Sequence, residues 1–303
     1  MTVGCNFVSS SYAGQVAELD AVARAKGVTL LPEMGMDPGI DLVFGRLAVD
    51  ELDVVHGLYS YGTGLPEPDC AGHNPLHYKI TWTFDGVLKA YKRSSRILKN
   101  GREVAIVGEE IFRDEHGHTV EIPGLGPLEA YPNGDAIHYI EVFGLGSEVR
   151  DMGRFALRYP GHRRFWAVMA ELGFLDDKPL PVDGGSISPR QFLVRHLTPK
   201  LQFAANERDV IILRVTAWGL KEGRQRRVTY QLIDYRDLNT GLFAMNRTVG
   251  YTASIAAQML LKGQITAAGV LSPTRHVPAM DLLRELKARG MKIEHRAEES
   301  EDL

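Results

Sequence analysis

This sequence has few cysteines, no long apolar run and no excess of positive charge. Its two cysteines, Cys5 and Cys70, cannot build a disulfide framework and fit a reducing compartment. No apolar run approaches the roughly 18 residues of a membrane span, and residues 1–11 lack the basic region of a signal peptide. The formal net charge of -3 argues against a nucleic-acid partner, which requires a basic face. These absences predict a cytoplasmic globular protein that binds neither membranes nor nucleic acid.

The signature motifs of several enzyme classes are absent too. No G-x-G-x-x-G follows a strand, because the nearest candidate, residues 144–149, lacks the third glycine. The phosphate-binding loop G-x-x-x-x-G-K-[ST], G-x-S-x-G and H-E-x-x-H do not occur either. Two histidine pairs have spacings that suit a metal, His73 with His77 and His116 with His118, but no third ligand accompanies them. We therefore expect no metal site.

The N-terminal part has the pattern of a strand, a helix and a second strand. Residues 2–9 predict a buried strand, and residues 28–31 predict another. Between them, residues 13–26 predict a helix that ends at Gly27 and has one apolar face, formed by Val16, Leu19, Val22 and Ala23. Short connections of this kind predict a parallel βαβ unit, resembling the closing half of a doubly wound sheet.

A turn with the sequence EMGMDPG, residues 33–39, leads from the second strand into a helix that ends near Asp50. Asp37 suits the cap of this helix, with Pro38 as its first residue. The same turn lies where doubly wound sheets bind ligands, and a helix N-terminus favours anions. A plain cap and a ligand site are both open at this point.

The remainder of the chain has an α+β pattern. Residues 53–61 and 148–159 are extended, residues 62–78 predict a long loop, and two hairpins turn at Asn100-Gly101 and at residues 221–223. Short strands are expected at residues 119–122 and 128–131. A helix is expected at residues 162–172, with an apolar stripe formed by Phe165, Met169 and Leu172. A second helix is expected to begin after a cap at Ser188. Two more helices are expected at residues 247–261 and 279–289. The acidic residues 298–303 predict a solvated tail.

Several long motifs occur in a characteristic order. They are SSY at residues 10–12, LPEMGMDPGID, YGTGLPEPDCAGHNPLHYKITWTFDGVL, EAYPNGDAIHY, LRYPGH, SPRQFLVRHL and RTVGYTASIAAQMLLKGQITAAGVLSP. Together they cover nearly the whole chain. In these motifs the sequence resembles the saccharopine dehydrogenase family, which includes glutamate-forming saccharopine reductases and lysine 6-dehydrogenases.

The resemblance implies a fold of class α/β plus α+β: a partial doubly wound Rossmann sheet followed by a mixed-sheet catalytic domain. We expect residues 1–50 to be the closing part of the Rossmann-like domain, residues 51–245 the substrate-binding and catalytic domain, and residues 246–303 helices that pack back on the first part. The family's first Rossmann strands and glycine-rich loop have no counterpart among these residues. We therefore expect weak binding of NADP or NAD.

The resemblance also implies a reaction, oxidation of an amine carbon of an amino acid with hydride transfer to nicotinamide. It assigns Asp37 as an acid/base or orienting carboxylate and Tyr12, after Ser11, as a substrate hydrogen-bond donor. The alternative for Tyr12 is core packing. The family's cofactor passes near the Asp37 turn and near a short tryptophan segment, which gives expected contacts at Gly35, Asp37, Pro38, Gly39, Thr81, Trp82 and Thr83.

Two positions depart from the saccharopine reductases. Those proteins have a cysteine at the position of Gly62 and an arginine at the position of Gly134, between Asn133 and Asp135. A guanidinium there would hold a substrate carboxylate through two hydrogen bonds. Its absence favours a smaller amino acid, or a carboxylate held by another cation such as Arg154 or Arg158. The substrate-binding set expected here is Ser11, Tyr12, Asp37, Asn133, Asp135, Arg154 and Arg158.

Two hypotheses follow. The chain is the catalytic part of an NAD(P)-dependent oxidoreductase whose nucleotide-binding front is lost or supplied by a separate chain. Alternatively, it is a non-catalytic amino-acid-binding or assembly protein that has lost cofactor binding. An unprotected edge on strand 2–9 further predicts a homo-oligomer or a partner chain.

Overall fold

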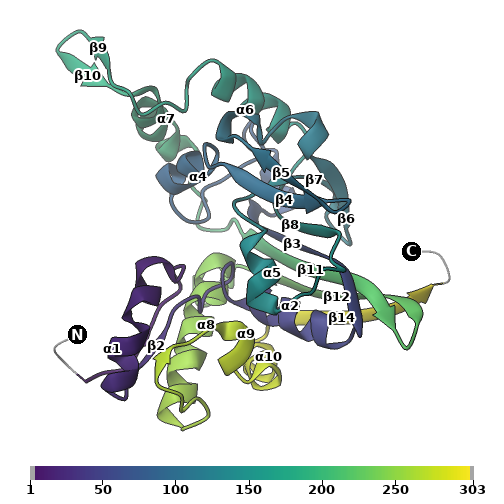
Figure 1. Cartoon of the computed structure of the whole chain (residues 1–303). Coiled ribbons are helices and arrows are strands. Elements are labelled where there is room, and N and C mark those ends of the chain that lie inside the picture. Colours follow the sequence, from purple (N-terminus) through teal and green to yellow (C-terminus); the bar gives the residue numbers. More distant parts are fainter. Residues whose placement is uncertain (1–3, 301–303) are drawn as a thin grey trace.

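A mixed sheet of nine strands forms the centre of the molecule (Figure 1). The computed structural model describes residues 4–300. The strand order is β14-β12-β11-β3-β8-β4-β5, and β7 pairs with both β8 and β6. The bounds are β3 Val54–Pro66, β4 Ser95–Lys99, β5 Arg102–Ile106, β6 His118–Ile122, β7 Gly126–Pro132, β8 Asp151–Arg158, β11 Asp209–Lys221, β12 Arg224–Tyr235 and β14 Lys292–Ser300. Strand β8 runs parallel to β3, whereas β11 is antiparallel to β3.

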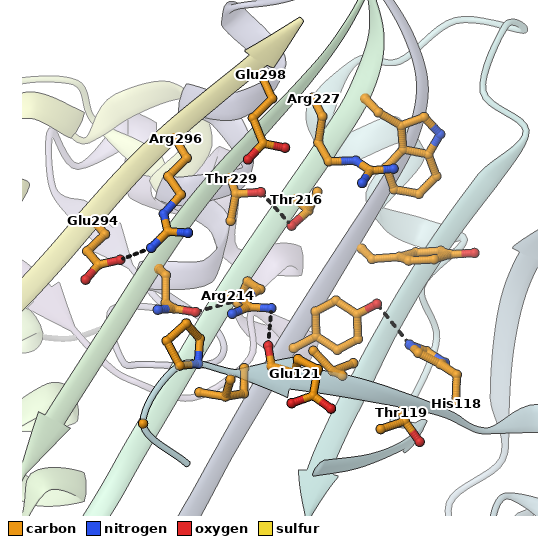
Figure 2. A pocket seen from close by; sticks show the side chains of 18 of the residues that line it. His118, Thr119, Glu121, Arg214, Thr216, Arg227, Thr229, Glu294, Arg296 and Glu298 are labelled. Atoms are coloured by element: carbon orange, nitrogen blue, oxygen red, sulfur yellow. Dashed lines mark hydrogen bonds and ion pairs between the residues drawn. The ribbon is translucent and has the colours of Figure 1, made fainter. Parts of the chain in front are cut away.

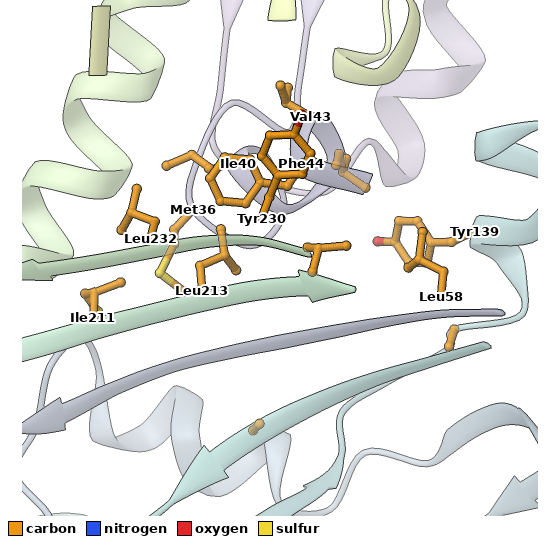
Figure 3. Packing of buried hydrophobic residues seen from close by; sticks show 14 of the residues in the cluster. Met36, Ile40, Val43, Phe44, Leu58, Tyr139, Ile211, Leu213, Tyr230 and Leu232 are labelled. Carbon is orange, nitrogen blue, oxygen red and sulfur yellow. The ribbon is translucent and has the colours of Figure 1, made fainter. Parts of the chain in front are cut away.

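The core lies between this sheet and α2, Ile40–Asp50 (Figure 3). Because successive side chains of a strand point to opposite faces, one set of residues on β11 and β12 meets the helix. Figure 3 shows Phe44 of α2 above Leu213 and Tyr230, and the ring centroids of Phe44 and Tyr230 are 5.6 Å apart. This packing fixes the start of α2, and with it the preceding turn, over the sheet.

A small parallel sheet forms the N-terminal unit, with the order β1-β2-β13. Its strands are β1 Phe7–Val8, β2 Thr29–Leu31 and β13 Gly269–Val270, and it is covered by η1 Gly14–Leu19 and α1 Asp20–Ala25. Gly27 follows the helix with a φ of 62°, as expected. The predicted parallel βαβ unit is confirmed, and the unpredicted β13 joins it from near the other end of the chain.

Helices surround the two sheets. Near the small sheet lie α8 Ala244–Leu261, α9 Pro273–His276 and α10 Ala279–Ala288 (Figure 1). The other segments are α3 Pro68–Ala71, α4 Phe84–Ala90, η2 Gly108–Glu110, η3 Asp114–His116, α5 His138–Phe143, α6 His162–Glu171, α7 Pro189–Leu197, η4 Thr198–Lys200 and the hairpin of β9 Leu180–Val182 with β10 Gly185–Ile187. No helix within residues 4–300 is long and apolar enough to cross a membrane. The expected combination of a partial parallel α/β unit and a mixed-sheet α+β region is confirmed.

The predicted role of Asp37 as a helix cap is wrong. Helix α2 begins at Ile40, and Gly39 is its N-cap residue. The Gly39 N–H donates to Oδ1 of Asp41, 2.7 Å away. The side chain that accepts this hydrogen bond at the helix N-terminus thus belongs to the first turn of α2 itself. Asp37 is therefore free to make a contact elsewhere. The predicted loop at residues 62–78 is also partly wrong, because β3 continues to Pro66.

Several predicted apolar faces point outward instead. The first strand is limited to Phe7–Val8, with Phe7 exposed, and residues 2 and 3 lie outside the described residues. In the first helical segment only Ala23 of the predicted stripe is buried, while Leu19 and Val22 are exposed.

Helix α6 buries a different face from the one predicted. Trp166 is buried, with its ring centroid 5.1 Å from that of Tyr91, whereas Phe165 and Leu172 are exposed. At the C-terminal end, residues 298–300 continue β14 and are not a free tail; residues 301–303 lie outside the described part.

Candidate active site

A cleft with a volume of about 750 Å³ separates the N-terminal unit from the central sheet. Its walls come from distant parts of the sequence: residues 10–12 after β1, residues 35–38 before α2, residues 62–64 of β3, Thr81 and Trp82, and the first two turns of α8. Five predicted substrate contacts line it, namely Ser11, Tyr12, Asp37, Asn133 and Arg158. Asp135 and Arg154 do not.

Asp37 forms an ion pair with Arg154 of β8 at the edge of the cleft. The guanidinium of Arg154 also contacts Oδ2 of Asp41 at 2.9 Å and donates to the Tyr139 hydroxyl at 2.7 Å. Its side chain is only 6% exposed. Arg154, predicted as a substrate contact, is thus already bonded to two carboxylates. In this arrangement it positions Asp37.

Asp41, the second carboxylate of this cluster, is buried, and its burial shifts its pKa. Desolvation raises the pKa of Asp41 to about 7, although the backbone N–H groups of Gly39 and Leu42 oppose the shift. The Arg154 guanidinium lies 2.9 Å from this carboxylate, and a cation so close favours the charged form of Asp41. Two carboxylates therefore share one buried cation, and Asp37 is the one that faces the cleft.

Tyr12 is 44% exposed, so core packing does not describe it. Its hydroxyl accepts a long hydrogen bond of 3.4 Å from Nη1 of Arg154. Its ring lies with its centroid 5.8 Å from the guanidinium carbon. Tyr12 and Asp37 thus meet at the same arginine and face the same space.

Arg158 contributes a second, differently bonded cation. It lies on β8 two positions beyond Ala156 and four beyond Arg154, hence on the same face of the sheet. Nη1 donates to Oγ1 of Thr63 at 2.7 Å and to a backbone carbonyl. Within residues 4–300 no carboxylate lies within 4.0 Å of this buried guanidinium. A buried cation without an anionic neighbour is costly unless an anion binds to it.

Tyrosine rings surround Arg158. The Tyr78 and Tyr131 ring centroids are 5.4 and 5.9 Å from its guanidinium carbon, within cation–π range. Next to them the Tyr91 hydroxyl lies 2.8 Å from Nε2 of His162. Burial holds the pKa of His162 well below its usual value, so the imidazole is neutral. It fixes the orientation of Tyr91, which lines the cleft.

Most of the residues expected near a nicotinamide also line the cleft. Gly35, Pro38, Thr81 and Trp82 do so, and the indole of Trp82 is 50% exposed. Thr83 instead caps α4, where its side chain accepts from the Gly86 N–H. Gly39 lies behind the turn, and a Cβ there would meet the backbone oxygen of Gly35 at 2.1 Å.

The two positions that depart from the saccharopine reductases have distinct surroundings. A Cβ at Gly62 would lie 2.9 Å from Oδ2 of Asp37, so glycine leaves room for that carboxylate. Gly134 has a φ of +80°. Asp135 pairs with Arg96 outside the cleft.

Sequence reasoning missed several residues of the site. Asp41 and Tyr139, which bind Arg154, and Arg93 and Tyr91, which line the cleft, were not predicted. On α8 the lining residues are Met245, Asn246, Val249 and Gly250. Their spacing places them on one face of the helix, which can be recognised in the sequence. Nothing in the local sequence, however, shows which face of the helix meets a ligand.

A second hollow lies on the opposite face of the central sheet (Figure 2). Its polar groups bond to one another: the Thr216 and Thr229 hydroxyls at 3.0 Å, the Tyr61 hydroxyl and His118 Nε2 at 2.9 Å, and the Arg214 guanidinium and the backbone carbonyl of Glu121 at 3.0 Å. None of the predicted site residues lines it. The cleft around Asp37 is the better candidate site.

Comparison with known proteins identifies the family of this chain. The model of the saccharopine dehydrogenase C-terminal domain family matches residues 35–291. The chain belongs to this family. The match begins at the turn that carries Asp37 and runs through the last helix.

The similar proteins differ in the share of their length that this chain covers. Alpha-aminoadipic semialdehyde synthase of Bos taurus, a mitochondrial protein, is 27% identical over 350 residues, covering 94% of this chain and 37% of the relative. Saccharopine dehydrogenase [NADP(+), L-glutamate-forming] of Pyricularia oryzae is 27% identical, covering 93% and 76%. The structure of apo saccharopine dehydrogenase (L-Glu forming) from Saccharomyces cerevisiae has a TM-score of 0.83 at 25% identity, covering 97% and 79%. The chain thus spans little more than a third of the bovine relative.

Proposed function

We propose that this chain is the substrate-binding and catalytic part of a saccharopine dehydrogenase-like oxidoreductase. It acts on the CH–NH group of an amino acid, saccharopine or lysine, with NAD(P). The observation that carries this proposal is the pair of opposite charges facing one cleft: the carboxylate of Asp37, and the guanidinium of Arg158, which has no carboxylate partner among the described residues. An amino acid presents the complementary pair, an amine and a carboxylate. The family and the names of its members support the reaction class.

Each charged group has a definite task in this proposal. Arg158 binds a substrate carboxylate, and the surrounding tyrosine rings keep water away from it. Asp37 holds the substrate amine, because Arg154 fixes its carboxylate and favours its negative charge. Tyr12 donates a hydrogen bond from the exposed side of the cleft. The chain thereby orients the amine carbon, which is the main contribution of a binding site to such a reaction.

The residues present fit one end of NAD(P). Gly35, Pro38, Thr81 and Trp82 line the same cleft, and Trp82 is an exposed aromatic residue there. When bound, the nicotinamide accepts the hydride. The sequence contains no glycine-rich loop that would hold the pyrophosphate. We propose that this loop is supplied from outside these residues, on the same polypeptide or on a partner chain.

The test is amine oxidation by the protein joined to a dinucleotide-binding half, followed by the absorbance of NAD(P)H. We expect turnover of saccharopine or lysine, and a fall in kcat of about 100-fold or more for Asp37→Asn, from loss of orientation and charge. Asp50→Asn, at the far end of α2, is the control and should match the wild type. Turnover that is unchanged in Asp37→Asn would remove Asp37 from the mechanism.

A second candidate is a non-catalytic amino-acid-binding or assembly protein. The glycines at positions 62 and 134 favour it, because they lack the side chains that the saccharopine reductases have there. It predicts that the chain binds an amino acid but never turns it over, even when a dinucleotide-binding half is supplied. For the chain alone, both candidates predict weak binding of NADPH. A micromolar dissociation constant from a fluorescence titration would contradict that expectation.

We further propose that the chain forms a homo-oligomer or binds a partner through the N-terminal unit. Strand β1 is an edge of its sheet. Phe7 on this strand, Leu19 on η1 and Val22 on α1 are exposed apolar side chains. Open edges with apolar neighbours favour pairing. Light scattering should give a mass above that of one chain, and Val22→Lys should reduce it. A monomer at high concentration would contradict this.

A cytoplasmic location is part of the same proposal. Neither cysteine is in a disulfide, which fits a reducing compartment. The mammalian relatives are named as mitochondrial, so cell fractionation is the deciding measurement.

A further inference from the structure

Arg93 lies in the segment between α4 and β4 and lines the cleft. A Cβ built on Gly134 would be 3.8 Å from both Cδ and Nη1 of Arg93. The guanidinium of Arg93 therefore stands beside the space that a side chain at position 134 would occupy. Arg93 reaches this space from another part of the sequence, about 40 residues earlier.

Backbone contacts hold these two segments together. The Gly134 N–H donates to Oγ of Ser95 at 3.0 Å, and the Arg96 N–H donates to the Gly134 carbonyl at 3.2 Å. The Arg96 guanidinium also pairs with Asp135 at 2.5 Å. These bonds fix the position of the residue 93 backbone relative to Asn133 and the cleft.

The neighbouring cations form ion pairs with carboxylates, whereas Arg93 forms none with the described residues. Lys92 pairs with Asp176 and Glu109 outside the cleft, and Arg96 pairs with Asp135. Among the residues that the structure describes, no carboxylate lies within 4.0 Å of the Arg93 guanidinium. Of the charged side chains that line the cleft, Asp37 is already paired with Arg154, which leaves Arg93 and Arg158 as two cations for anionic groups.

We propose that Arg93 determines specificity by binding a second substrate carboxylate, in place of an arginine at position 134. Arg158 binds one carboxylate in the tyrosine-lined part of the cleft, and Arg93 binds another at its exposed rim. The cleft therefore selects an amino acid with at least two carboxylates over one with a single carboxylate. This inference rests on the proposed function of the cleft as an amino-acid site.

The experiment is isothermal titration calorimetry of the full chain with two probes, saccharopine, which carries several carboxylates, and lysine, which carries one. Arg93→Ala should weaken saccharopine binding by about 10- to 100-fold, the usual effect of losing a charged hydrogen-bonded pair. It should change lysine binding by less than about 2-fold. Arg93→Lys should fall between, because an ammonium cannot make the forked contact.

Arg102→Ala removes a guanidinium from an exposed position on β5, outside the cleft, and is the matched control. It should bind both probes like the wild type. Thermal melting of each variant shows that it is folded.

The outcomes separate this inference from the proposed function. If the wild type binds saccharopine and Arg93→Ala binds it equally well, Arg93 is a solvated charge and the inference fails alone. Equal losses for both probes in Arg93→Ala would overturn its role in specificity. If the wild type binds neither probe at millimolar concentration, the proposed function fails and this inference with it.

Discussion

Replacing Arg154 by methionine tests the charge cluster beside the cleft. Methionine keeps most of the volume of the side chain but removes its charge. Asp41 is then left buried without its cation, and Asp37 loses its partner. Breaking a buried ion pair from one side costs about 3–5 kcal/mol, and we expect a loss of stability in this range at pH 8.

The loss should depend on pH with a defined sign. Burial raises the pKa of Asp41 to about 7 in the folded protein, against about 3.9 in an unfolded chain. The folded state therefore binds more protons than the unfolded state in this window, and stability falls as pH rises through it. Without Arg154 the pKa rises further, so the decline continues above pH 7. Because one pKa unit corresponds to about 1.4 kcal/mol, the variant should lose at least about 1 kcal/mol more at pH 8 than at pH 5.

Urea unfolding at pH 5 and pH 8, with linear extrapolation, measures both quantities. Arg96→Met is the control, because it makes the same substitution in an exposed ion pair. It should cost less than about 1 kcal/mol of unfolding free energy at either pH. Adding Asp41→Asn to Arg154→Met should recover part of the loss, since the buried charge is gone. A loss below about 1 kcal/mol, or an equal loss at both pH values, would refute the reasoning.

Two further predictions concern stability. Lys79→Met should cost about 3 kcal/mol in urea unfolding, because it leaves Glu207 buried without its ammonium partner at 2.6 Å; Lys89→Met, from an exposed pair, should cost about 0.5 kcal/mol or less, and equal costs would contradict the burial argument. Gly39→Ala should lower the melting temperature and weaken amino-acid binding, because its Cβ would meet the Gly35 carbonyl oxygen at a φ of +147°; a variant that melts and binds like the wild type would contradict this.

Local patterns predicted the parts of the fold whose cause is local. The hairpin at Asn100-Gly101 is confirmed, with both residues at positive φ. The cap at Ser188 is confirmed, since its hydroxyl accepts from the Gln191 N–H. Helix α2 ends at Asp50, as the periodicity indicated. In each case the information lies within a few residues.

Elements and contacts that depend on distant residues could not be predicted in this way. Strand β14 is rich in charged residues, because one of its faces is the open hollow of Figure 2, so it lacks apolar alternation. The partner of Asp37 is Arg154, more than a hundred residues along the chain, and no local signal connects them. The place of Arg93 beside Gly134 is set by the pairing of two loops. Most of the residues that the family motifs indicated line one cleft, whereas their ion pairs depend on packing between distant parts of the chain.

A crystal structure of the chain soaked with saccharopine tests the central claim most directly. We expect ligand density in the cleft, with a carboxylate in hydrogen-bond range of the Arg158 guanidinium and the amine in hydrogen-bond range of the Asp37 carboxylate. Density in the hollow of Figure 2, or a ligand in the cleft that contacts neither residue, would contradict it.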